Sequence, residues 1–227
     1  MMKNWWHYNK WYVICGAVLL GIICNLAGSY LGLWEKQPDF QIAYIGKAML
    51  PEDTVSALET AFSSLGNELD FNQDGEVLVK VNQYISSGST TDPELAQYAY
   101  AAEITLTADI NDCESYFFLM EDAEQFQRDF HVLARFDGSC PEDADDSTED
   151  KTVLWADCAA LSGLKLGSCS VVTAGETITK NSQELLADCS FGRRCFYTER
   201  RTDYAEKCDE LWDSLIDKHE GGPIHEM

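Results

Sequence analysis

Basic residues are scarce in this chain of 227 residues. Lys and Arg number 16 against 39 Asp and Glu, so the net charge at neutral pH is −23. A surface of this sign repels phosphate backbones and anionic lipid headgroups, which argues against nucleic acid as a partner. It favours cations or cationic partners, or it serves solubility alone.

Motifs of common catalytic and metal sites are also absent. The chain has no G-x-S-x-G, no H-E-x-x-H, no P-loop and no C-x-x-C pair, and it has only four histidines. Zinc and hydrolase chemistry therefore lack their usual residues. Glu121 and Asp122 could form a carboxylate pair, but acidic residues in such a place are more typical of a helix start. We expect that the protein is not an enzyme.

Charge is absent between Trp11 and Trp34. This apolar run is long enough for a membrane-spanning helix, which needs about 20 residues. Lys3 and Lys10 precede it, so the positive-inside rule places the N-terminus in the cytoplasm and the remainder outside. The sequence thus predicts a single-pass protein of the cell membrane whose C-terminal domain is extracellular.

This topology divides the chain into three parts. Residues 1–10 are expected in the cytoplasm, residues 11–34 form the transmembrane signal anchor, and residues 38–227 form an extracellular domain. A cleaved signal peptide is the competing interpretation, because residues 27–29 are small enough for a peptidase site. The apolar run exceeds a usual signal core, so we favour the uncleaved anchor.

Seven of the nine cysteines lie outside the apolar run. An extracellular location permits disulfides, and an odd number leaves at least one cysteine unpaired or available to another chain. Cys189 and Cys195 flank a short segment, as do Cys158 and Cys169, so these are the two candidate bridges. The connectivity itself does not follow from the sequence.

Apolar periodicity after residue 38 predicts strands that alternate with helices. Strands are expected at 40–46, 77–85 and 114–120, and helices at 51–65, 92–112 and 121–133. An acidic loop at 137–151 is followed by strands at 152–158, 168–175 and 193–200 and a helix at 203–219. The composition of the acidic loop requires no fixed structure. We predict an α/β fold: the transmembrane helix, a mostly parallel three-layer βαβαβ lobe, additional C-terminal strands and a final helix.

The order of these elements resembles the first lobe of extracellular solute-binding proteins. The resemblance runs from Phe40 to Phe136 and rests on the strand FQIAYIG, the helix after it, the helix ELAQYAYAAEITLTADIND and the strand CESYFFLM. It implies a ligand cleft lined by strand ends. The domain is too short for the two lobes such proteins usually have, so it corresponds to one elaborated lobe.

The stretch LDFNQDGEVLVKV resembles the first half of an EF-type or dockerin-type calcium loop. Asp70, Asn72 and Asp74 match ligand positions one, three and five, and Glu76 would offer its backbone carbonyl at position seven. Position twelve is Val81, where the EF-hand pattern requires a bidentate Glu. The sequence predicts a weak, structural calcium site. The alternative is a polar turn whose side chains bond their own backbone.

Polar residues stand near the carboxyl ends of two predicted strands, where open α/β sheets bind ligands. They are Tyr44, Asn82, Gln83 and Tyr84. The alternative is that they are ordinary strand-end residues. We predict a membrane-anchored extracellular binding domain for an unknown solute or protein. The alternative function is a structural or regulatory ectodomain that contacts another membrane or cell-wall protein and holds a structural calcium ion.

Overall fold

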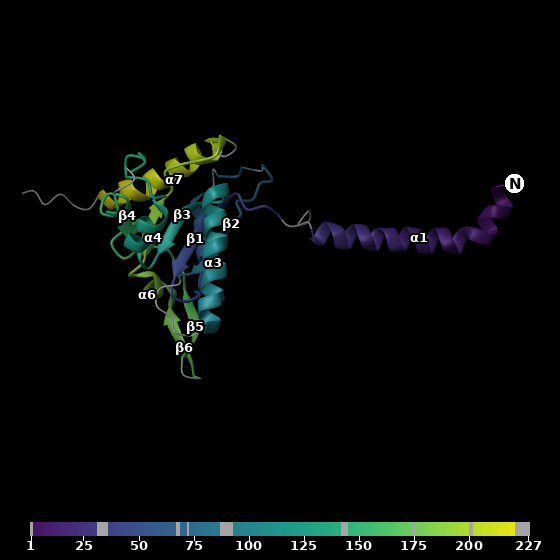
Figure 1. Ribbon diagram of the computed structural model, residues 1–227, viewed down its shortest axis with the longest axis horizontal. Helices are drawn as coiled ribbons and strands as arrows, with labels where there is room; N and C mark the ends of the chain where they lie inside the picture. The colour runs from purple at the N-terminus through teal and green to yellow at the C-terminus, as the bar shows by residue number, and fades with distance from the viewer. Residues whose placement is uncertain are drawn as a thin grey trace, which may run out of the picture. The chain divides into compact units, whose positions relative to one another are not determined.

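The computed structural model describes most of the chain (Figure 1). The described residues are 2–30, 36–66, 69–71, 73–86, 93–141, 145–173, 176–199 and 202–220. The chain divides into two compact units, Met1–Gln37 and Pro38–Met227.

The first unit contains the helix α1 (Met2–Tyr30). Among the described residues of the chain, no helix is long and apolar enough to cross a membrane. The finding contradicts the prediction of a transmembrane anchor at residues 11–34, of which 31–34 lie outside the described residues. It equally contradicts the predicted single-pass membrane location, and the extracellular assignment of residues 38–227 loses its basis.

The second unit is built on a mixed five-stranded sheet in the order β2-β1-β3-β7-β4. Its strands are β1 (Phe40–Gly46), β2 (Val79–Ile85), β3 (Ser115–Met120), β4 (Thr152–Leu154) and β7 (Ser190–Arg193). β1 pairs with β2 and β3 in parallel, whereas β7 runs antiparallel to both β3 and β4. The sheet is therefore mixed and not mostly parallel as predicted, although its βαβαβ part, β1 to β3, is parallel. Antiparallel neighbours need no helical crossover, and an apolar run in the sequence does not reveal strand direction.

Helices cover both faces of the sheet (Figure 1). The longer ones are α2 (Glu52–Leu65), α3 (Pro93–Asp112), α4 (Ala123–Phe130) and α7 (Thr202–Glu220), and the short ones are α5 (Ala159–Ser162) and α6 (Ser182–Leu186). A separate hairpin joins β5 (Ser168–Thr173) to β6 (Glu176–Asn181).

Alternation along β3 divides the core into two layers, because successive side chains of a strand point to opposite faces. Phe117 and Leu119 join the cluster beneath α2 and α7, which includes Trp212. Phe118 and Met120 join the cluster beneath α3 and α4. The helix after β1 and the helix after β2 thus lie on opposite faces, as right-handed crossovers require when the chain moves first to one side of β1 and then to the other.

The C-terminal strands differ from the prediction in position. The expected strand at 152–158 is shortened to β4, because residues after Leu154 turn into α5. The expected strand at 193–200 lies instead at β7, and only an isolated bridge between Leu133 and Arg194 extends it.

Candidate functional site

A cleft of about 340 Å³ opens at the carboxyl ends of the three parallel strands. We call it the carboxyl-edge cleft. The side chains that line it are Ile45, Lys47, Tyr84, Ile85, Ser86, Glu103, Leu106, Glu121, Asp122, Gln125, Phe126, Asp129 and Phe130. They come from the ends of β1, β2 and β3 and from the facing turns of α3 and α4. The strand order reverses at β1, and this switch point is where open α/β sheets form ligand crevices.

Glu121 follows β3 directly and is held in place by two donors. The Tyr44 hydroxyl donates to its Oε1 at 2.7 Å, and the Lys47 backbone N–H donates to its Oε2 at 3.1 Å. Burial, together with the neighbouring Glu121 carboxylate, raises the pKa of Tyr44 well above its ordinary value. The phenol therefore remains a proton donor to Glu121 throughout the neutral range, and the carboxylate is fixed before any ligand arrives.

Two further carboxylates of the cleft are fixed by Gln125. Asp122 caps the N-terminus of α4, where its Oδ1 accepts the Gln125 backbone N–H at 3.0 Å. The Gln125 side-chain amide donates to the Asp129 oxygens at 2.8 and 2.9 Å. Glu103, exposed on α3, is the fourth acidic residue of the lining. Lys47 is the one basic residue among the described lining residues.

Apolar side chains form the remainder of the cleft. The Phe126 and Phe130 rings lie 5.2 Å apart on α4, and Leu106 reaches the cleft from α3. Tyr84 also lines the cleft, and its hydroxyl donates to Asp109 at 2.7 Å in the interior. Apolar walls with several oriented polar groups are typical of small-molecule sites.

The four predicted ligand residues have different surroundings. Of these, only Tyr84 lines the carboxyl-edge cleft, and Tyr44 acts on it through Glu121. The Asn82 amide donates to Gln41 Oε1 at 2.6 Å, and the Gln83 Oε1 accepts the Leu50 backbone N–H at 2.7 Å. Among described residues, the last two make structural bonds away from the cleft.

The predicted calcium loop is described except for Asn72, which lies outside the described residues. Asp70 accepts the backbone N–H groups of Asp74 and Gly75 at 3.1 and 2.9 Å, and Asp74 accepts that of Glu76 at 2.9 Å. Within the described part of the chain, no group of three or more His, Cys, Asp or Glu side chains could hold a metal ion. These bonds support the polar-turn alternative, and calcium binding stays a prediction.

Sequence reasoning missed Asp39, whose carboxylate spans the same loop. Asp39 is 4% exposed, and its two oxygens accept the backbone N–H groups of Phe71 at 2.9 Å and Leu78 at 2.7 Å. Its own N–H donates to the Leu78 carbonyl at 2.7 Å. A lone acidic residue just before a strand was the only signal in the sequence.

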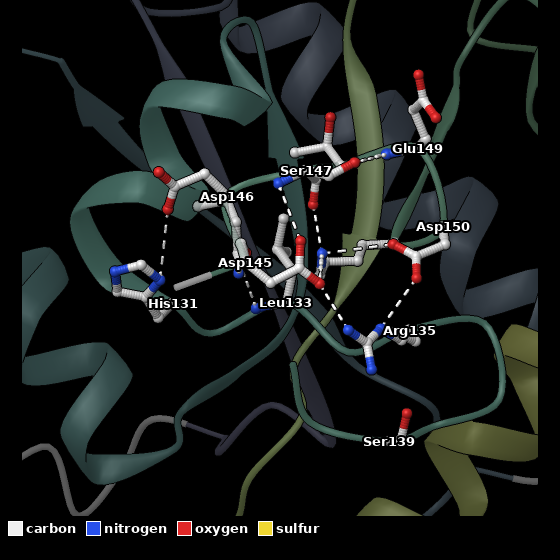
Figure 2. Close-up of polar contacts among 12 residues, drawn as sticks. His131, Leu133, Arg135, Ser139, Asp145, Asp146, Ser147, Glu149 and Asp150 are labelled. Carbon is white, nitrogen blue, oxygen red and sulfur yellow. Dashed lines mark hydrogen bonds and ion pairs between the residues drawn. The ribbon is translucent and has the colours of Figure 1, made fainter. Parts of the chain in front are cut away.

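The acidic loop at 137–151 is ordered around two cations where it is described (Figure 2). Arg135 contacts Asp145 at 2.6 Å and Asp150 at 2.9 Å. The fully buried Lys151 ammonium lies 3.0 Å from Asp145 and 3.4 Å from Asp150, and it also donates to the Ser147 carbonyl. Our expectation that the loop needs no fixed structure does not hold for its described residues, because Asp145 and Asp150 lie beside a fully buried lysine, which the count of acidic residues alone does not show.

All nine cysteines are free thiols in the structure. β7 occupies the segment between Cys189 and Cys195, and an extended strand of that length separates their Cα atoms by on the order of 15–20 Å. A disulfide needs Cα atoms within about 7 Å, so this geometry does not allow the Cys189–Cys195 bridge. Cys158 donates to the Leu215 carbonyl of α7, whereas Cys169 donates to the Lys180 carbonyl of β6, so these two thiols face different elements.

Comparison with known proteins gives no relative for this chain. No family model, no curated protein and no solved structure matches it. The candidate function therefore rests on the geometry of the carboxyl-edge cleft.

Proposed function

We propose that this protein is a binding protein whose carboxyl-edge cleft takes an organic cation with an apolar body. The observation that carries the proposal is the lining itself, in which Glu103, Glu121, Asp122 and Asp129 surround aromatic and aliphatic walls. An ammonium or guanidinium group would meet these carboxylates, and its hydrocarbon part would lie against the rings of α4. The volume of about 340 Å³ suits a small molecule.

Preorganisation supports binding at this place. The Tyr44 and Gln125 bonds already fix three of the four carboxylates, so a ligand need not pay the entropy of ordering them. The net charge of −23 adds a long-range attraction for cations, which is screened by salt. The proposal thus narrows the predicted solute-binding role to cationic ligands. The prediction that the protein is not an enzyme remains a prediction.

Thermal unfolding of the full chain with benzylamine tests the proposal, with phenylacetate as the anion of similar size. Benzylamine is expected to raise Tm in a dose-dependent way at low salt, and phenylacetate is expected to leave it unchanged. Equal effects of the two compounds would contradict the assignment of a cationic ligand.

Glu121→Gln removes the central charge of the cleft and is expected to weaken benzylamine binding at least about tenfold in calorimetry, or about 1.4 kcal/mol. Glu206→Gln makes the same chemical change on the exposed side of α7 and serves as the matched control. If both variants weaken benzylamine binding equally, the loss of affinity comes from the change in net charge, and the cleft is not the binding site.

A further inference from the structure

Two cysteines that are distant in the sequence lie against each other at the end of β7. The Cys140 thiol donates to the Cys195 carbonyl at a sulfur–oxygen distance of 2.8 Å. The corresponding distances of the buried thiols Cys158 and Cys169 to their carbonyls are 3.8 and 3.6 Å. The Cys140 sulfur therefore lies unusually close to the backbone of Cys195.

The backbone on both sides of this contact is fixed. Ala134 donates to the Arg193 carbonyl at 2.8 Å, and Cys195 donates to the Val132 carbonyl at 2.9 Å, so the segment before the acidic loop pairs with the end of β7. The chain then turns back through a bond from the Gly138 N–H to the Arg135 carbonyl at 2.8 Å. This turn carries Cys140 over Cys195.

A second set of bonds holds the turn on β7. The Arg193 guanidinium donates to the Phe136 carbonyl at 2.9 Å. Asp137 Oδ1 accepts the backbone N–H and the hydroxyl of Ser139 at 2.9 and 2.6 Å. A small movement of the two cysteine side chains therefore suffices to bring their sulfur atoms into bonding contact.

We propose that Cys140 and Cys195 form a disulfide under oxidising conditions. The bridge fastens the acidic loop to the end of β7. It replaces the Cys189–Cys195 pairing that the sequence suggested and that β7 keeps apart.

The chemistry is a thiol–disulfide exchange with a low-molecular-weight disulfide such as glutathione disulfide. The exposed Cys140 thiolate attacks one glutathione sulfur, a mixed disulfide forms, and one glutathione leaves as the thiolate and takes up a proton. The Cys195 thiolate then attacks the Cys140 sulfur and releases the second glutathione. The two cysteines lose two electrons and two protons, and glutathione disulfide gains them.

The order of attack follows from the two environments. Cys140 is exposed, whereas Cys195 is partly buried. Burial, followed by the hydrogen bond with Cys140, raises the pKa of Cys195 to about 12. Cys195 is therefore mostly protonated at neutral pH and reacts second, when the mixed disulfide on Cys140 is already beside it.

Peptide mapping of the full chain tests the bridge. The native protein is equilibrated with glutathione disulfide, remaining thiols are blocked with iodoacetamide, and the monomer is digested with trypsin without reductant. Trypsin places the three relevant cysteines in separate peptides, residues 136–151, 181–193 and 195–200. The expected product links 136–151 to 195–200 and weighs two hydrogens less than their sum.

Variants and an unfolded control make the outcome decisive. Cys140→Ser is expected to abolish the linked peptide, whereas Cys189→Ser is expected to leave it unchanged. In urea its yield should fall at least about tenfold, because the fold no longer holds the sulfurs together. Recovery of both peptides in alkylated form, a link between 181–193 and 195–200, or a bridge found only between two chains would each overturn the proposal.

Discussion

Single buried side chains determine how several loops of this protein are held. Asp39 is one example, since one carboxylate receives N–H groups from both ends of the loop between Phe71 and Leu78. Gln127 is another: it is fully buried, its Oε1 accepts the Leu133 N–H at 3.1 Å, and its amide donates to the Asp145 carbonyl at 3.2 Å. Each links segments that lack regular secondary structure to the helices and strands of the core.

Asp39→Ala is expected to lower the free energy of unfolding by about 3 kcal/mol, because two N–H groups lose their acceptor in a buried place. Asp39→Asn keeps one oxygen and should cost about half as much. Urea titration of the full chain measures both. A change below about 0.5 kcal/mol for the alanine variant would mean that water replaces the carboxylate.

The ion pairs of Asp145 predict a dependence of stability on pH. The hydrogen bonds from Arg135 and then Lys151 lower the pKa of Asp145 below its ordinary value in the folded state. Its contribution is therefore complete above the unfolded pKa of about 3.9 and is lost as the pH falls through the lower folded value.

Asp145→Asn should accordingly lower Tm by a constant amount between pH 5 and pH 8 and by less as the pH drops below about 4. Scanning calorimetry over this range provides the measurement. Glu210→Gln, on the exposed side of α7, is the control for the change of net charge. If the Tm difference between Asp145→Asn and the unchanged protein stays the same at low pH, the packing of the Asp145 side chain, and not its charge, stabilises the fold.

At the scale of elements, the sequence predicts correctly the helices and strands whose apolar residues recur with a regular spacing. The stripe of Leu58 and Phe62 places α2, and the continuous apolar run of β3 marks a central strand. β7 has no such signal, because its four residues include Gly192 and Arg193 and its strand character comes from pairing with β3. The position of the carboxyl-edge cleft follows from parallel strand order, but its acidic lining depends on α3 and α4 side chains whose facing turns the sequence does not reveal.

The loop between Leu69 and Val79 gives a test at this scale. If the predicted calcium site binds its ion, millimolar calcium is expected to raise Tm relative to chelator, and Asp74→Ala is expected to abolish the rise. If Asp70 serves only the turn, whose backbone N–H groups its two oxygens accept, Tm stays unchanged. Gly75, at φ +85°, is needed by the turn in either case.

At the scale of the whole molecule, the division into two units predicts that residues 38–227 fold alone. Both hydrophobic clusters and the complete five-stranded sheet lie within this part. The fragment is expected to unfold cooperatively, with a Tm within about 2 °C of the full chain. Circular dichroism of both chains is the comparison. A broad transition or loss of near-ultraviolet signal in the fragment would mean that residues 1–37 complete the core.

The place of β7 in the sheet has a consequence during synthesis. β7 is the last strand in the described part of the chain, yet it lies between β3 and β4. The outer edge of β3 therefore stays unpaired while residues 121–189 are being made, and that strand is fully buried in the finished fold. An apolar open edge readily pairs with other chains. A nascent chain released before residue 190 would carry this edge exposed, so premature termination is expected to yield aggregates instead of a smaller stable domain.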